Sequence, residues 1–86
     1  MNLRIAARHF DLSENLKDHA ERRVVPLRRF FDKVIDADLV LISEKNRQTA
    51  ELTFHVKGGA ITARTETEDM YGSIDTVTDK IERQLK

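Results

Sequence analysis

The sequence predicts an α+β domain with the element order β-α-β-β-β-α, a two-layer sandwich of a four-stranded mixed sheet with two parallel helices on one face. Apolar and polar residues alternate in segments 2–8 and 48–56, as in half-buried strands. Apolar residues recur at three- and four-residue spacing after Ser13 and again towards Leu85, as on amphipathic helices. The chain has 86 residues, which is enough for one small domain.

The amino-terminal third predicts one strand followed by one helix. Residues 2–8, NLRIAAR, place Leu3, Ile5 and Ala7 on one face of the strand. Ser13 is a candidate N-cap for a helix from about Glu14 to Phe31. The apolar stripe of this helix consists of Leu16, Ala20, Val24, Leu27 and Phe31.

Pro26 interrupts the predicted first helix. Its ring removes one backbone donor and clashes with the carbonyl of Arg22, four residues earlier. We therefore expect a kink or a tightened turn at this position.

Three strands and a second helix are predicted for the rest of the chain. Residues 37–45, ADLVLISEK, are apolar on both faces, which favours a central strand. Residues 48–56 alternate, Lys57-Gly58-Gly59 forms a hairpin turn, and residues 60–66 return as the next strand. The stripe of the second helix consists of Tyr71, Ile74, Val77, Ile81 and Leu85.

The chain connections predict how these elements are arranged. A right-handed β-α-β crossover makes the first two strands parallel, and the short connections that follow make the remaining strands an antiparallel meander. Both helices then run in the same direction on one face of the sheet. Their carboxyl ends should therefore lie at the same end of the domain.

Composition excludes several classes of protein. Fifteen basic and fifteen acidic residues give a formal net charge of zero, which argues against indiscriminate nucleic-acid binding. The chain has no cysteine, which excludes disulfides and thiolate chemistry and fits a reducing cytoplasm. No apolar run reaches the roughly 18 residues of a membrane-spanning helix, so we expect a cytoplasmic protein without a membrane partner.

The charges are nevertheless unevenly distributed along the chain. Residues 22–33 contain five bases and one acid, a net charge of +4, and residues 80–86 contain three bases and one acid, a net charge of +2. Residues 11–21 contain four acids and one lysine, a net charge of −3. If the helices are parallel, their basic ends form one electropositive surface.

Two interpretations of this surface compete. Acids at helix starts and bases at helix ends are also favoured by the helix macrodipole, by about 0.3–1 kcal/mol each. However, the dipole needs one or two cations in the last turn, whereas Arg22 and Arg23 lie well before the end of the predicted helix. Arginine binds phosphate through a bidentate fork, so the pattern favours contact with a nucleic-acid backbone.

No catalytic, metal or cofactor site is predicted. The three histidines, His9, His19 and His55, lack the i, i+4 spacing of a helical metal pair. No nucleophile with an adjacent base is evident, and Gly58-Gly59 is not followed directly by a helix, as a phosphate-binding loop would be. We expect a binding protein without a small-molecule substrate, and not an enzyme.

Two alternative functions remain open. One is a protein-interaction module on the open sheet face, where two apolar residues of the LVLI segment, 39–42, would be exposed beside Thr53, His55 and Arg64. The other is a generic structured-RNA-binding domain. A double-stranded RNA-binding domain has a basic cluster at the start of its last helix, whereas acids stand there in this sequence. These acids are Glu66, Glu68 and Asp69.

Four segments resemble the hibernation promoting factor family, which includes ribosome-associated inhibitor A. They are DLSENLKDHAERR, FFDKV, LTFHVKGG and EDMYGSIDTVTDKIERQLK, and the resemblance covers essentially the whole chain. It implies the fold predicted above, which is similar to double-stranded RNA-binding domains. It also implies binding to the small ribosomal subunit in the decoding channel, where the mRNA and tRNA sites are occupied and translation is reversibly inhibited under stress or in stationary phase.

The resemblance also implies which residues contact ribosomal RNA. Arg23 and Arg29 on the first helix, and Lys80 and Arg83 on the second, occupy the basic positions of the family. The charge pattern adds their neighbours Arg22 and Lys86. Pro26 departs from the family, whose members commonly have a basic residue there, and this puts one RNA contact in doubt.

The resemblance also bears on domain organisation. We expect residues 1–86 to form a single ribosome-binding domain, because the sequence ends soon after DKIERQLK. It thus lacks the acidic tail of the inhibitor A branch and the second, dimerising domain of long-form members. The protein is therefore expected to be a short form or the amino-terminal domain of a long form, and promotion of ribosome dimers remains open.

Overall fold

The computed structural model describes residues 2–30 and 34–85 and confirms the predicted order of strands and helices, with a 3₁₀ helix added. The elements are β1 (Asn2–Arg8), α1 (Glu14–Val24), the 3₁₀ helix η1 (Val25–Phe30), β2 (Val34–Glu44), β3 (Arg47–Val56), β4 (Gly59–Thr67) and α2 (Met70–Leu85).

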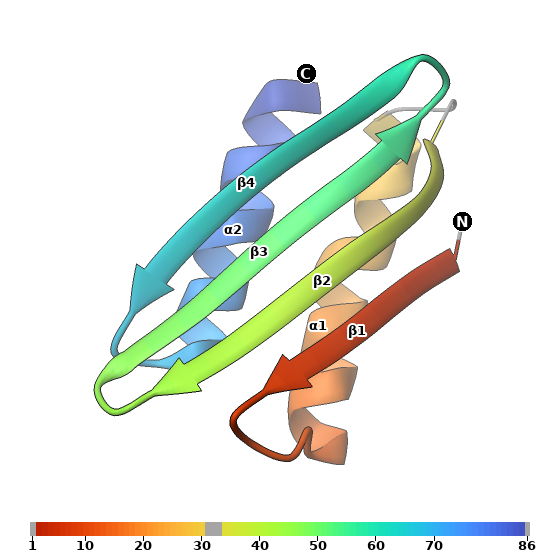
Figure 1. The fold of residues 1–86 in the computed structure, drawn as a ribbon. Helices are drawn as coiled ribbons and strands as arrows, with labels where there is room; N and C mark the ends of the chain where they lie inside the picture. Colours follow the sequence, from red (N-terminus) through yellow and green to blue (C-terminus); the bar gives the residue numbers. More distant parts are fainter. Residues whose placement is uncertain (1, 31–33, 86) are drawn as a thin grey trace.

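The sheet has the predicted mixed topology. Its strand order is β1-β2-β3-β4, with β1 and β2 parallel and the other two pairs antiparallel. Figure 1 shows both helices on one face of this sheet, running in the same direction. Their carboxyl ends lie together at the upper end of the view, as predicted, and the β3–β4 hairpin reaches the same end.

The α-helical part of the first helix is shorter than predicted. Ser13 is its N-cap, as expected, because its hydroxyl accepts a hydrogen bond from the Leu16 backbone N–H at 3.1 Å. The α-helix ends at Val24, and the chain continues to Phe30 as η1. Pro26 explains the change, since it lacks an N–H donor and its ring crowds the preceding turn. The predicted tightened turn is thus confirmed, whereas Phe31 lies outside the described residues.

The boundaries of β2, β3 and β4 differ from the prediction by one to three residues, most of all at the start of β2. β2 begins three residues earlier, at Val34, and a β-bulge between Val34 and Asp36 leaves the side chain of Ile35 62% exposed. The β3–β4 turn contains Lys57 and Gly58 alone, because Gly59 already pairs with Val56. Gly58 has a φ of 92°, which glycine adopts without the steric penalty of a side chain.

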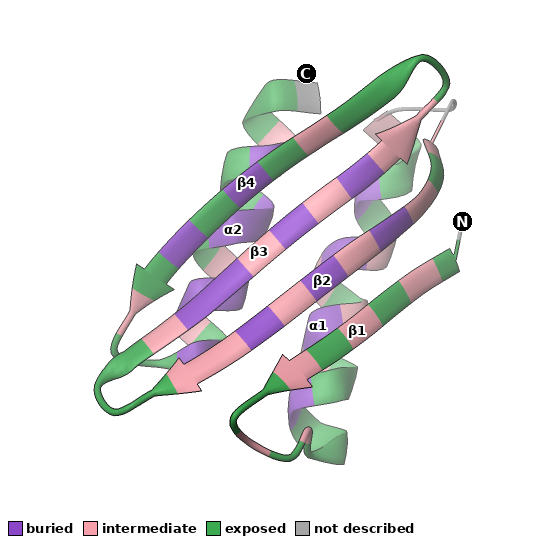
Figure 2. Ribbon diagram, in the orientation of Figure 1, coloured by how far each residue is buried: buried purple, intermediate pink, exposed green. Residues whose placement is uncertain are grey.

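The core lies between the inner face of the sheet and the two helices. Figure 2 shows the buried residues alternating along β2 and β3, the two central strands. Leu39, Leu52 and Phe54 on these strands are fully buried, as are Val24 on α1 and Ile74 on α2. β1 is an edge strand and is only half-buried, as its alternation predicted.

One residue of the predicted α2 stripe is not a core residue. Tyr71 is 39% exposed, and its ring stands edge-on to His19 of α1 with the ring centroids 5.0 Å apart. Met70 is buried instead. Both residues precede Ile74 by helical spacing, three and four positions, so periodicity alone did not separate them.

Candidate nucleic-acid interface

The two helices bring three exposed arginines to one end of the domain. Arg28 and Arg29 form the last turn of η1, and Arg83 lies in the last turn of α2. We call these three residues the basic end. No carboxylate of residues 2–30 and 34–85 lies within ion-pair distance of them. Their guanidinium groups can therefore face an external anion.

Arg29 is partly preorganised for such a contact. Its guanidinium carbon lies 4.9 Å from the centroid of the neighbouring Phe30 ring, a cation–π arrangement. Stacking limits the rotamers of the side chain while its N–H groups remain able to donate to phosphate. Arg28 was not singled out from the sequence, although it belongs to the same basic run; the exposure of both arginines at the end of η1 identifies it.

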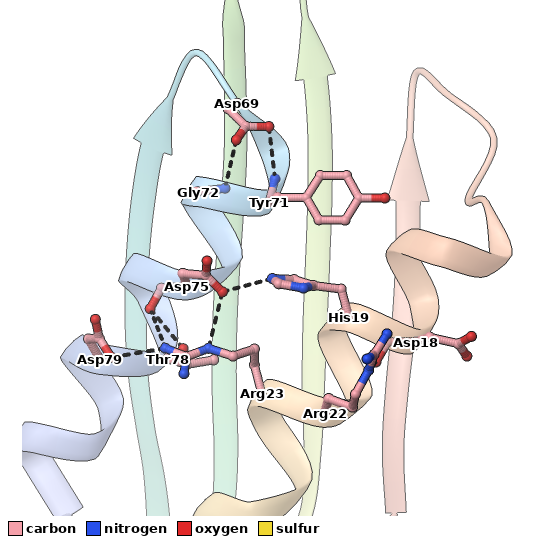
Figure 3. A network of polar contacts seen from close by, with 10 residues as sticks. All are labelled: Asp18, His19, Arg22, Arg23, Asp69, Tyr71, Gly72, Asp75, Thr78 and Asp79. Atoms are coloured by element: carbon pink, nitrogen blue, oxygen red, sulfur yellow. Dashed lines mark hydrogen bonds and ion pairs between the residues drawn. The ribbon is translucent and has the colours of Figure 1, made fainter.

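Arg23 is engaged between the helices. Its Nε lies 3.1 Å from Oδ1 of Asp75, and its Nη2 lies 3.0 Å from Oδ1 of Asp79. Asp75 also contacts Nε2 of His19 at 2.7 Å, so one carboxylate of α2 joins two side chains of α1 (Figure 3). This cluster connects the two helices, and Arg23 can bind phosphate only in competition with these carboxylates.

Arg22 lies outside this interhelical cluster. Figure 3 shows it beside Asp18 on the outer side of α1, where its Nε lies 3.4 Å from the backbone oxygen of Asp18. Beyond the cluster, a groove of about 140 Å³ separates η1 from α2. Its lining residues are Arg22, Arg23, Pro26, Leu27, Arg29, Thr78, Asp79 and Glu82. The groove thus carries both signs of charge, unlike the basic end.

The contribution of the Arg23–Asp79 ion pair to the free energy of unfolding can be measured. Because both side chains are about half exposed, solvent screens the pair and limits its contribution. In a double-mutant cycle with Arg23→Gln and Asp79→Asn, we expect a coupling of about 0.5 kcal/mol in the free energy of unfolding, measured by urea denaturation. Arg22→Gln is the matched control and should show no coupling with Asp79→Asn. Equal coupling for both arginines would contradict the interhelical assignment.

Lys80 is also used within the fold. Its Nζ donates a hydrogen bond of 3.0 Å to the backbone oxygen of Arg64 on β4, an edge strand of the sheet. This hydrogen bond links α2 to the edge of the sheet. Lys86, the last of the six predicted contact residues, lies outside the described residues. The structure therefore brings Arg29 and Arg83 to one end, engages Arg23 and Lys80 elsewhere, and leaves Arg22 on the flank.

The opposite end of the helices is acidic, as the sequence predicted. The Asp69 carboxylate caps α2 by accepting hydrogen bonds from the backbone N–H groups of Tyr71 and Gly72, both at 3.3 Å (Figure 3). Glu14 lies in the first turn of α1. These acids complement the positive ends of the helix dipoles and would repel a phosphate backbone.

Charges on the open sheet face pair with one another. The Arg4 guanidinium donates to Asp38 at 2.6 Å and to Asp36 at 3.1 Å, and His55 Nε2 lies 2.7 Å from Asp38. The hydrogen bond from Arg4, and then that from His55, lower the pKa of Asp38 to about 2. The same carboxylates raise the pKa of Arg4. Most polar atoms of this cluster are thus paired within it, although Oδ1 of Asp36 is buried without a hydrogen-bond partner.

The apolar residues predicted to be exposed on the open face of the sheet are only partly exposed. Val40 and Ile42 are both half-buried, and the Arg64–Glu51 ion pair, at 3.6 Å, flanks them. A shallow hollow of about 420 Å³ crosses this face near Thr53 and His55. Neither Val40 nor Ile42 is among the exposed large apolar residues, which in residues 2–30 and 34–85 are Ile35 and Tyr71.

The described residues contain neither a metal-binding group nor a membrane-spanning helix. Across residues 2–30 and 34–85, no three metal-binding side chains of histidine, cysteine, aspartate or glutamate come together in a group that could hold an ion. Neither helix in that part of the chain has the length and apolar character needed to cross a bilayer.

Comparisons with known proteins agree on one family. Residues 3–86 match the family described as "Sigma 54 modulation protein / S30EA ribosomal protein". A ribosome hibernation promoting factor of Azotobacter vinelandii is 36% identical over 85 residues, which cover 99% of this chain and 79% of the relative. The factor of the same name from Escherichia coli K12 is also 36% identical, over 99% of this chain and 90% of the relative.

Solved structures share the fold. The crystal structure of the Thermus thermophilus Protein Y N-terminal domain superimposes with a TM-score of 0.90 and 28% identity, covering 100% of this chain and 97% of that one. A ribosomal subunit interface protein from Coxiella burnetii gives a TM-score of 0.87 at 24% identity, covering 99% of this chain and 93% of that one. The second likeness concerns the fold alone.

Proposed function

The chain belongs to the sigma 54 modulation protein and S30EA ribosomal protein family, and from this membership we propose that it is a ribosome hibernation factor. In this proposal it binds the small ribosomal subunit in the channel that holds mRNA and tRNA. It inhibits translation reversibly by occupying that channel, without catalysis and without a cofactor, in the cytoplasm of a stressed or stationary-phase cell.

The observation that carries this proposal is the convergence of basic helix ends on a neutral protein. The parallel arrangement of α1 and α2 brings Arg28, Arg29 and Arg83 to one end, while Asp69 and Glu14 lie at the other. A dipolar domain of this kind has no strong attraction for polyanions in general, but it orients one end towards them. Family membership supports ribosomal RNA as the polyanion in this proposal.

The proposed contact surface comprises the six predicted residues and Arg28, in unequal roles. The basic end, Arg28, Arg29 and Arg83, supplies the principal phosphate contacts, because these residues are exposed and lack carboxylate partners among the described residues. Arg22, Arg23 and Lys80 extend this surface along the helices, and Lys86, outside the described residues, stays a predicted contact. Phosphate contacts of this kind position the domain without reading base sequence.

Co-sedimentation tests the proposal. Purified protein is centrifuged with small subunits, large subunits and whole ribosomes at roughly 50 mM and 200 mM salt. If about four phosphates are neutralised, small-subunit affinity should fall on the order of 100-fold between these concentrations, because bound counterions are released. Bound tRNA and mRNA should be displaced from the small subunit. Absence of small-subunit binding at the lower salt would refute the proposal, and gradient profiles would show whether ribosome dimers form.

A further inference from the structure

The β3–β4 hairpin lies at the same end of the domain as the basic end. Figure 1 shows its tip at the same end of the domain as the carboxyl ends of both helices. The register supports this placement, because Val56 at the end of β3 pairs with Val34 at the start of β2, the strand that follows η1. Three features of the fold therefore lie at this end of the domain: the end of η1, the end of α2 and this hairpin.

Covalent geometry limits how far the hairpin can be from η1. Four peptide links separate Phe30 from Val34, a span of about 14 Å at most. The Val34–Val56 pair adds one strand spacing of about 5 Å. These limits place Val56 no more than about 19 Å from Phe30 at the end of η1, a distance that one extended RNA surface can span.

The tip of this hairpin is open and positively charged. Lys57 is exposed, and no carboxylate of residues 2–30 and 34–85 pairs with it. A Cβ built on Gly58 or on Gly59 would meet no atom within 4 Å, so nothing in the domain covers the tip. A phosphate group can therefore approach the lysine and the neighbouring backbone closely.

The other hairpin provides a natural contrast. Lys45 also follows directly after a strand, in the two-residue turn between β2 and β3, and it is exposed. However, this turn lies at the opposite end of the sheet, towards the acidic helix starts (Figure 1). Its neighbours Glu44 and Arg47 form an ion pair at 3.5 Å.

We propose that Lys57 is an additional ribosomal RNA phosphate contact, so that the RNA-binding surface extends from the helix ends across the tip of the sheet. The inference rests on the proposed function and deepens it, because it adds an element outside the two helices to the surface. The domain then contacts RNA with one whole end, and the sheet is part of the docking surface as well as the support for the helices.

The test compares two matched variants, Lys57→Gln and Lys45→Gln. Affinity for purified small subunits is measured from about 50 to 200 mM salt, with circular dichroism as a check that both variants fold. We expect Lys57→Gln to bind roughly three- to tenfold more weakly at the lower salt, and its plot of log affinity against log salt to be less steep by about 0.7–0.9, the loss of one phosphate contact. Lys45→Gln should match the wild type in both respects.

The outcomes separate this inference from the function on which it rests. Wild-type binding with an unchanged salt slope for Lys57→Gln would overturn the hairpin contact and leave the hibernation function standing. An equal loss for both lysine variants would also overturn it, because the effect would then be one of overall charge. No binding by the wild type would refute the proposed function itself and the hairpin contact with it.

Discussion

A variant in which Arg29 and Arg83 are both replaced by Glu is expected to lose small-subunit binding. Its affinity at physiological salt should fall by a factor on the order of 100 or more. Each replacement removes a cation that is proposed to meet phosphate and substitutes a repelling anion. Both side chains are exposed, so the free energy of unfolding should change by less than about 1 kcal/mol. Co-sedimentation and urea denaturation measure the two quantities independently.

The control for this variant has the same change in net charge at the other end of the domain. Lys17→Glu with Lys45→Glu also lowers the charge by four, at two exposed lysines away from the carboxyl ends of the helices. It should bind nearly as well as the wild type. Comparable losses for the two double variants would contradict a localised RNA surface. Lys80 is left unchanged in this variant because its side chain donates a hydrogen bond to the backbone oxygen of Arg64. Replacing Lys80 could therefore change the stability of the domain as well as its affinity for RNA.

The second large effect is expected from Phe54→Ala. Phe54 is fully buried at the centre of the sheet, where its neighbours in register are Ala37 on β2 and Ile61 on β4. Removing its ring should cost about 3–5 kcal/mol through lost burial and the remaining cavity. For a domain of this size the melting temperature should fall by roughly 15–30 °C, as measured by thermal circular dichroism. The variant should lose small-subunit binding at temperatures above its lowered melting temperature.

Tyr71→Ala is the control for this prediction. Tyr71 was placed in the core by its spacing, but it is 39% exposed and packs edge-on against His19. Tyr71→Ala should therefore lower the free energy of unfolding by about 1 kcal/mol, well below the loss expected for Phe54→Ala. A larger loss at Tyr71 than at Phe54 would show that the sheet core is not the main source of stability.

The order and type of the elements were predictable because they follow from local periodicity. Alternation in residues 2–8 and 48–56, and the Ser13 cap, depend on neighbours within a few positions. The parallel helices followed from chain handedness. Pro26 also acted locally, since a missing donor and a steric clash change the turn that contains it. The exact helix type at residues 25–30 required the structure.

The candidate site was predictable as a region and not as a set of contacts. Charge counting and the family resemblance pointed to the helix ends, and Arg29 and Arg83 are both exposed in the last turns of η1 and α2. They did not identify the carboxylates that engage Arg23, nor the backbone oxygen that engages Lys80. Lys57 was predicted only as part of a hairpin turn, and the structure places that turn at the same end as the carboxyl ends of the helices.

The sequence by itself determined the strands, the helices, their order and the accumulation of positive charge at two helix ends, because each depends on spacing along the chain. Only the tertiary structure decided which cations remain available. Arg23 and Asp79 are 56 residues apart and meet because α1 and α2 pack side by side. Such contacts depend on the rotation and separation of packed elements, which side-chain volumes across the whole core set together.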